Sequence, residues 1–157
     1  MKIKTKLNLG VGLLFVLILI LSLVCAYYIF SIKKDTENIL KANYNTLEYS
    51  RNMLLSLDEL AVNENKAIAL FEINLKKQVA NITEVNEDIV TNKLETNFSI
   101  LKKNSNNEKV KAQIRENIFQ IMKLNMEAIK IKSDIAKHTA ETANLWIAVV
   151  GTLCFLI

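Results

Sequence analysis

The residues of this chain that could carry out chemistry begin with a single histidine. His138 is the only histidine among 157 residues, and Thr139 and Ala140 follow it. A histidine that accepts a phosphoryl group is usually followed by an acidic residue, and a general base needs a partner within hydrogen-bonding reach. We expect His138 to be solvated or to face lipid headgroups. We predict no catalytic residue, no enzyme activity and no cofactor within these residues.

Cys25 and Cys154 are the two cysteines, and both sit inside apolar segments. Neither has a histidine or an acidic residue close by, as a metal site or an activated nucleophile would require. If both apolar segments cross a membrane, the two cysteines lie at different depths in it, so a disulfide within one chain is not expected. Both are interpreted as small packing residues, and no metal site is predicted.

Arg51 and Arg115 are the only arginines among 20 basic residues. A guanidinium is a better bidentate partner for a carboxylate than an ammonium group. Arg51 lies one heptad from Tyr44 and from Asp58, which gives a polar stripe suited to a pocket at a dimer interface. We therefore name Arg51, Tyr44 and Arg115 as candidate ligand-binding residues. The alternative is a pair of surface ion pairs, with Glu48 near Arg51 and Glu116 next to Arg115.

The elements that position these residues are predicted to be long helices. The chain has no proline, and its three glycines, Gly10, Gly12 and Gly151, leave residues 13–150 without either residue type. A fold with many tight turns needs glycine and proline for their special backbone angles. The net charge of +4 comes from lysines interleaved with acidic residues. Nucleic-acid binding calls for a concentrated basic face, so no nucleic-acid partner is expected.

The apolar run from Leu9 to Phe30 predicts a transmembrane helix. As a helix it reaches about 33 Å, enough to cross a hydrocarbon layer of roughly 30 Å. A cleaved signal peptide is the first alternative, but its apolar region is usually about 7–15 residues long and no small-residue cleavage site follows. A lipoprotein anchor is the second, and here Val24 occupies the place before Cys25 where a small residue is usual.

The last stretch, from Leu145 to Ile157, is uncharged, and Trp146 near its start is expected at the membrane interface. Thirteen residues span only about 20 Å, so we expect the start of a second, truncated membrane helix and a longer parent protein. A complete protein with a re-entrant or interfacial C-terminal segment is the alternative.

Lysines before the first span set the expected orientation. Lys2, Lys4 and Lys6 favour a cytoplasmic N-terminus, although Lys33 and Lys34 dilute this bias. The predicted domains are a cytoplasmic N-terminus at 1–8, a transmembrane helix at 9–30, an extracytoplasmic domain at 31–144 and the second span at 145–157. The expected location is the bacterial cytoplasmic (inner) membrane.

Apolar residues recur every seven positions through the region outside the membrane. One stripe holds Ile32, Ile39, Thr46, Met53 and Leu60, and a neighbouring one holds Leu40, Leu47, Leu54 and Ala61. Ile114, Ile121, Ala128 and Ile135 form a third, with polar Asn125 and Lys132 nearby. Heptads indicate helices that pack at shallow angles. We predict that Ile39, Leu47, Met53, Ile121 and Ile135 pack the helices and transmit the signal.

Three corners are predicted between these helices. The first lies at residues 63–65, where an asparagine would take up the left-handed conformation that ends helices. Thr83 is expected to cap the third helix, which would bury Ile89, Val90, Leu94, Phe98 and Leu101. Ser105 and Glu108 have the spacing of a capping box before the fourth helix. The predicted fold is all-α: an antiparallel four-helix bundle flanked by one full and one truncated transmembrane helix.

The chain resembles the extracytoplasmic sensor region of bacterial transmembrane sensor histidine kinases, in the four-helix-bundle class shared with chemoreceptors. Three segments carry the resemblance: MKIKTKLNLGVGLLF, KDTENILKANYNTLEYSRNMLLSLDEL and IFQIMKLNMEAIKIKSDIAKHTAETANLW. It covers essentially the whole chain and includes no catalytic motif. The phospho-accepting histidine and the nucleotide-binding glycines of such kinases have no counterpart here, and are expected beyond Ile157.

This resemblance implies a homodimer anchored in membrane lipid, with an unknown small-molecule or protein signal as a further partner. Binding outside would shift the first helix against the fourth, as a piston, rotation or tilt, and so control a cytoplasmic kinase. One alternative is the ligand-binding half of a methyl-accepting chemoreceptor. Another is a structural membrane scaffold that binds a protein partner and senses nothing.

Overall fold

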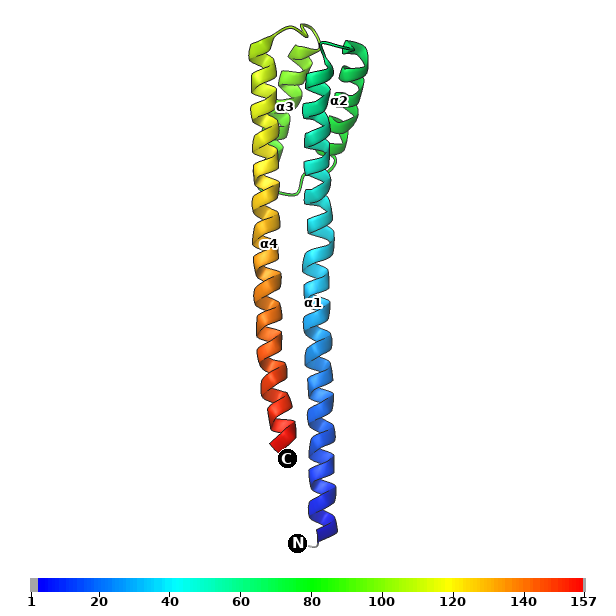
Figure 1. Ribbon diagram of the computed structural model, residues 1–157, viewed down its shortest axis with the longest axis vertical. Coiled ribbons are helices and arrows are strands. Elements are labelled where there is room, and N and C mark those ends of the chain that lie inside the picture. Colours follow the sequence, from blue (N-terminus) through cyan, green and yellow to red (C-terminus); the bar gives the residue numbers. More distant parts are fainter. Residues whose placement is uncertain (1–2, 157) are drawn as a thin grey trace. The chain divides into compact units, whose positions relative to one another are not determined.

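The chain folds into helices joined by short turns (Figure 1). The structure, a computed structural model, describes residues 3–156, apart from the side chains of Lys6, residues 34–39 and Leu156. The helices are α1 (Ile3–Glu59), α2 (Glu64–Val79), α3 (Glu87–Leu101) and α4 (Glu108–Leu156), and no strand forms within 3–156. The all-helical prediction is confirmed, and α1 ends at Glu59, shortly before the predicted corner at residues 63–65.

The helices form two compact units. The first, here called the terminal unit, comprises Met1–Glu37 and Lys132–Ile157; the second, here called the core unit, comprises Asn38–Ile131. Both long helices, α1 and α4, contribute residues to each unit, whereas α2 and α3 lie wholly within the core unit.

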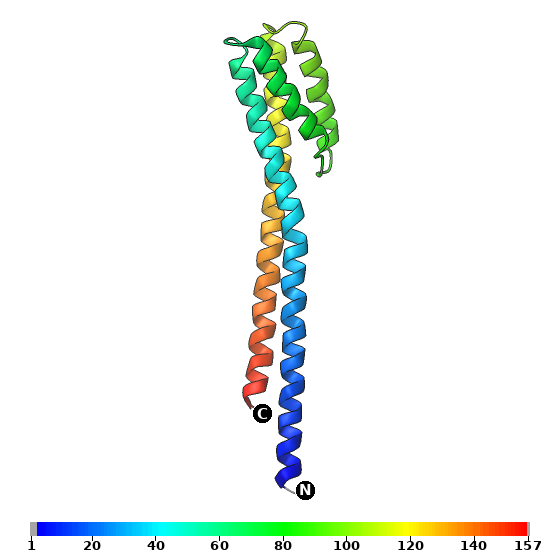
Figure 2. The ribbon, with the colours of Figure 1, turned by 90° about the vertical axis from the view of Figure 1, so that its right-hand side faces the viewer.

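The core unit is held together by one hydrophobic cluster to which all four helices contribute. Within this unit, α2 and α3 lie alongside the adjoining parts of α1 and α4 (Figures 1 and 2). The rings of Phe71 and Phe98 stack within this cluster, with centroids 4.2 Å apart. The buried members are Met53, Leu57, Leu60, Ala67, Phe71, Leu75, Leu94, Phe98, Leu101, Val110, Ile114, Ile118 and Ile121. Burying such side chains is the main source of stability in a helical domain.

The turn between α1 and α2 differs from the expected geometry. Asn63 has a φ of −149°, and its side chain accepts a hydrogen bond from the Lys66 N–H at 3.1 Å. It therefore acts as the N-cap of α2, satisfying one of the free N–H groups at the helix start. The described residue with a left-handed backbone is instead Asn86, with a φ of 66°, immediately before α3.

The helices α3 and α4 also begin with other capping residues than those predicted. Thr83 is not the cap of α3, because that helix begins four residues later at Glu87. Glu87 reaches back and accepts hydrogen bonds from the backbone N–H groups of Thr83 and Glu84, at 2.9 and 3.0 Å. At α4 the cap is Asn107, whose Oδ1 accepts from the Val110 N–H at 3.2 Å. An asparagine carbonyl fits this position as well as a serine hydroxyl does.

Most of the expected helix faces are the buried ones. Leu94, Phe98 and Leu101 on α3 are buried, as are Ile114 and Ile121 on α4. Ile89 departs from the prediction, since it is 49% exposed at the start of α3. Glu87 and Thr91 take the inward positions of that first turn instead.

The terminal unit contains one helix segment long and apolar enough to cross a membrane, Ile3–Lys33 in α1, judged by length and composition. Near its end, Tyr27 and Tyr28 lie edge to face, with ring centroids 5.7 Å apart. Together with Leu23, Val24 and Trp146 of α4, they line a single hollow of about 440 Å³. Cys25 and Cys154, in the same unit, are free thiols.

Candidate functional site

The three candidate ligand-binding residues do not form one pocket. Arg51 and Tyr44 are exposed on α1, Tyr44 by 57%. Arg115 on α4 forms an ion pair with Asp58 of α1, rather than with its neighbour Glu116. The Arg51 side chain makes no hydrogen bond or ion pair with any residue that the structure describes. The structure thus brings together Asp58 and Arg115, and leaves Arg51 and Tyr44 in solvent.

The predicted packing residues have different environments. Met53 and Ile121 are fully buried in the hydrophobic cluster, and Leu47 is half-buried. In the terminal unit, Ile135 is 45% exposed and Trp146 is 49% exposed. The side chain of Ile39 lies outside the described residues.

A polar groove between α3 and α4 is the most distinctive surface feature of the core unit. Its volume is about 450 Å³, and five of its eight lining residues carry side-chain amides. The lining residues are Asn92, Lys93, Thr96 and Asn97 on α3, and Gln113, Glu116, Asn117 and Gln120 on α4. We call this feature the amide groove. It lacks any aromatic or large aliphatic side chain.

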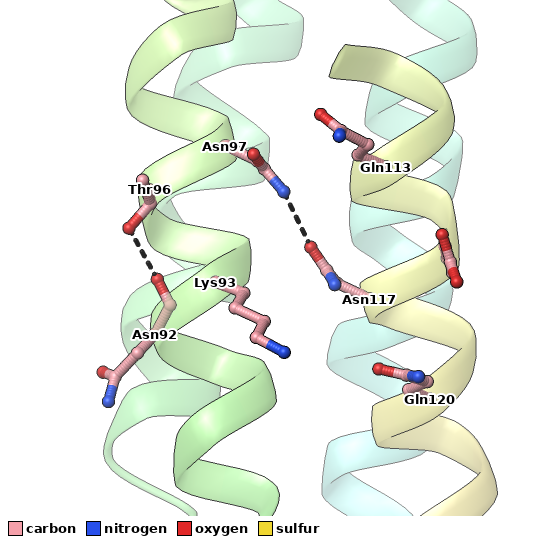
Figure 3. A pocket seen from close by; sticks show the side chains of 8 residues that line it. Asn92, Lys93, Thr96, Asn97, Gln113, Asn117 and Gln120 are labelled. Carbon is pink, nitrogen blue, oxygen red and sulfur yellow. Dashed lines mark hydrogen bonds between the residues drawn. The ribbon is translucent and has the colours of Figure 1, made fainter. Parts of the chain in front are cut away.

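Side chains from both helices point toward one another across the amide groove (Figure 3). Lys93 and Asn97 extend from α3 toward α4, and Gln113, Asn117 and Gln120 extend from α4 toward α3. Asn97 Nδ2 donates a hydrogen bond to Asn117 Oδ1 at 2.9 Å, which links the two helices. Figure 3 shows Asn92 and Thr96 on the outer side of α3, so they form the edge of the groove.

Several polar groups in the amide groove have no partner. Asn117 is 8% exposed, yet its Nδ2 makes no hydrogen bond within residues 3–156. The same part of the chain offers no hydrogen bond or ion pair to the side chains of Lys93, Gln113, Glu116 and Gln120. Asn117 Nδ2 is not one of the fully buried side-chain atoms that lack a partner, so water or a ligand in the groove can reach it. The groove is therefore a set of free donors and acceptors held by two rigid helices.

The sequence contains a signal for this groove that an apolar pattern does not reveal. Gln113, Asn117 and Gln120 are spaced by four and three residues, which places them on one helix face. Lys93 and Asn97 have the same spacing on α3. Polar residues at this spacing are also typical of a helix face exposed to solvent. Only the packing of α3 beside α4 shows that the two stripes face each other.

A second polar cluster lies inside the core unit, around the fully buried Glu87. Its Oε1 accepts from Gln78 Nε2 at 2.8 Å and from Asn125 Nδ2 at 2.7 Å, in addition to the two backbone donors on Oε2. Asn43 of α1 donates to Glu84 Oε1 at 3.0 Å and to the Asn125 carbonyl at 3.4 Å. These bonds connect all four helices. Four donors match the acceptor capacity of an ionised carboxylate.

Four buried side-chain atoms of the core unit have no hydrogen-bond partner in the described part of the protein. They are Ser50 Oγ, Gln78 Oε1, Thr91 Oγ1 and Asn125 Oδ1, one from each helix. Gln78 and Asn125 meet at Glu87, and Thr91 lies one helical turn beyond Glu87 on α3. The cluster therefore combines a fully satisfied carboxylate with neighbouring amide and hydroxyl groups that are not satisfied.

No protein-family model, curated protein or solved structure matches this chain. Within residues 3–156, no three His, Cys, Asp or Glu side chains gather in a way that could hold a metal ion. The candidate site therefore has to be interpreted from its own geometry, and that geometry is suited to hydrogen bonding.

Proposed function

We propose that this chain is the membrane-anchored sensor and signal-transmission region of a receptor of the sensor-histidine-kinase type. Residues 31–144 would form an extracytoplasmic antiparallel four-helix bundle, flanked by spans at 9–30 and from 145 onward. One observation carries the proposal. The helix α1 contains the candidate span Ile3–Lys33 and also contributes Met53 and Leu57 to the hydrophobic core.

The aromatic residues of the terminal unit support the proposed topology. Tyr27 and Tyr28 near the end of the first span share one hollow with Trp146 at the start of the second apolar stretch. Tyrosine and tryptophan concentrate where the hydrocarbon layer meets the headgroups. These three rings would mark the outer boundary of the membrane for both helices.

The contacts between α1 and α4 suggest how a signal would travel. In the core unit these helices are joined by the Asp58–Arg115 ion pair and by the bond from Asn43 Nδ2 to the Asn125 carbonyl. A relative shift of the two helices would exchange these contacts for others. Packed helices move as stiff units between discrete arrangements, by about 1–2 Å for small shifts. Such a shift is the proposed output of the bundle.

A homodimer is part of the proposal, and α4 offers a surface that supports it. Phe119 and Met126 lie one heptad apart on this helix, and each is 57% exposed. Apolar side chains repeated at this interval suit a helix that packs against a second copy. A kinase or a chemoreceptor output would be compatible with the same arrangement.

Cysteine labelling in intact bacterial cells tests the topology. The native Cys25 and Cys154 are first replaced by alanine, and a single cysteine is then introduced by Asn65→Cys, at an exposed position on α2. A membrane-impermeant maleimide should label this variant without lysis. The matched Lys4→Cys variant, before the span, should react only after the membrane is permeabilised. Protection of Asn65→Cys in intact cells, or recovery of the chain in the soluble fraction, would refute the proposal.

A further inference from the structure

We infer that the amide groove is a binding site for a neutral saccharide of one or two rings. The claim that this saccharide is the stimulus of a sensor rests on the proposed function. The claim that it binds rests only on the geometry and chemistry of the groove. The volume of about 450 Å³ lies within the range of roughly 300–1,000 Å³ that small-molecule sites occupy.

The lining of the groove excludes apolar and strongly charged ligands. An apolar ligand gains affinity by burying carbon surface, and the groove presents amides, a threonine, one lysine and one glutamate. Lys93 and Glu116 carry opposite charges, so the site has no net charge to attract an anion or a cation. A neutral, strongly hydrogen-bonding ligand remains.

Hydroxyl groups match the free groups of the groove. An amide side chain offers both donors and acceptors, and a sugar hydroxyl donates and accepts at once. Asn117 Nδ2 is a free donor at the groove floor, Lys93 is a donor, and Glu116 is an acceptor. Gln113 and Gln120 lie on either side of Asn117 and point toward α3 (Figure 3). A row of ring hydroxyls could engage these groups together.

A peptide is a weaker fit for the same groove. Peptide segments are usually recognised by strand edges or by grooves with apolar pockets for alternate side chains. The amide groove has neither, because it lies between two helices and its lining is polar. A free amino acid would need its carboxylate near Lys93 and its ammonium near Glu116, and would leave most of the amides unused.

The experiment uses the full chain in phosphatidylcholine nanodiscs, because many mild detergents carry sugar headgroups that would compete. The side-chain amides are labelled with ¹⁵N, and glucose, galactose, N-acetylglucosamine, maltose and lactose are titrated in turn. At least one sugar should give saturable shifts of the Gln113, Asn117 and Gln120 resonances. Gln113→Ala and Gln120→Ala should each weaken binding by about five- to tenfold, as expected for one lost hydrogen bond.

Two comparisons make the result decisive. Asn65→Ala, on the exposed face of α2, removes an amide outside the groove and should leave the affinity unchanged. Glutamine and a short glycine peptide serve as non-sugar probes. The inference is overturned if none of the five sugars shifts the groove resonances, if the alanine variants bind as well as the parent, or if a non-sugar probe binds more tightly. Cysteine labelling in cells tests only the topology of the proposed sensor, and the titration tests only sugar binding. Either proposal can therefore fail while the other holds.

Discussion

The polar residues inside the core unit are the least expected feature at the level of single residues. Glu87, Gln78, Thr91 and Asn125 are all fully buried, in positions where a helical heptad would ordinarily place aliphatic side chains. A buried polar network can specify how helices pair, but every unsatisfied member lowers stability. Replacing a hydrogen-bonded member of this cluster should therefore lower the free energy of unfolding, and replacing a member without a partner should raise it.

Thr91→Val should raise the free energy of unfolding by about 1 kcal/mol. The buried Thr91 hydroxyl has no partner within residues 3–156, so replacing it with a methyl group removes a desolvation cost and adds apolar surface. Chemical denaturation followed by circular dichroism measures the change. Thr96→Val on the same helix is the control; its exposed hydroxyl bonds only the Asn92 carbonyl, and stability should change little. A marked loss of stability in Thr91→Val would mean that water or a ligand satisfies the hydroxyl.

Glu87→Leu should lower the free energy of unfolding by about 3 kcal/mol or more. It removes the acceptor of four hydrogen bonds, leaves Gln78 Nε2 unpaired inside the protein, and leaves Asn125 Nδ2 with the Ile121 carbonyl alone. The same denaturation measurement applies. Glu95→Leu, at an exposed position two turns along α3, should have an effect of less than about 0.5 kcal/mol. Equal losses of stability at the two positions would contradict the role of Glu87 as the shared acceptor of the buried polar cluster.

The helices themselves follow largely from the sequence, whereas their ends do not. The absence of Gly and Pro from residues 13–150 and the heptads containing Met53 and Ile121 indicate long packed helices. Each of the three corners falls close to its predicted position, but the capping residues differ. Asparagine, serine and threonine compete for such positions with similar energies, so local chemistry cannot choose among them. The amide groove was not predictable either, because it depends on which faces of α3 and α4 meet.

Asn63→Ala should destabilise the core unit by about 1 kcal/mol, the usual cost of losing a helix N-cap. Its Oδ1 accepts from the Lys66 N–H, and alanine cannot replace that acceptor. Thermal unfolding of the full chain in nanodiscs would report the loss as a lower Tm. Asn65→Ala, inside the same helix, should be neutral or slightly stabilising because alanine favours helices. A larger effect at Asn65 would show that Asn63 is not the cap.

For the molecule as a whole, the division into a terminal unit and a core unit matches a division in chemistry. The terminal unit carries the apolar candidate span and the aromatic residues, and the core unit carries the hydrophobic cluster, the polar cluster and the amide groove. A protein that spans a membrane and folds outside it would need this separation. The location of Trp146 tests it directly.

Trp146 is the only tryptophan, so its fluorescence reports on one position. In bilayers with brominated lipids, quenching should be strongest when the bromines lie near the headgroups and weaker when they lie near the bilayer centre. The Trp146→Phe variant with a new tryptophan at Val16, in the middle of the first span, should show the reverse order. Deep quenching of Trp146, or none, would contradict its proposed position at the interface.

The arrangement of the polar and hydrophobic clusters has a consequence for motion. In α1 the buried polar residues Asn43, Thr46 and Ser50 precede the buried apolar residues Met53 and Leu57. In α4 the buried residues Val110, Ile114, Ile118 and Ile121 precede Asn125, and beyond Asn125 only the small Ala128 is a buried apolar residue of the core unit. Cohesion within the core unit therefore weakens toward residues 38 and 131, where the two units join. Local opening should begin there, so backbone amides at 43–50 and 125–131 should exchange with solvent before those at 53–60 and 110–121. In the proposed function, the segment that loosens first is the one through which a movement of the core unit would pass.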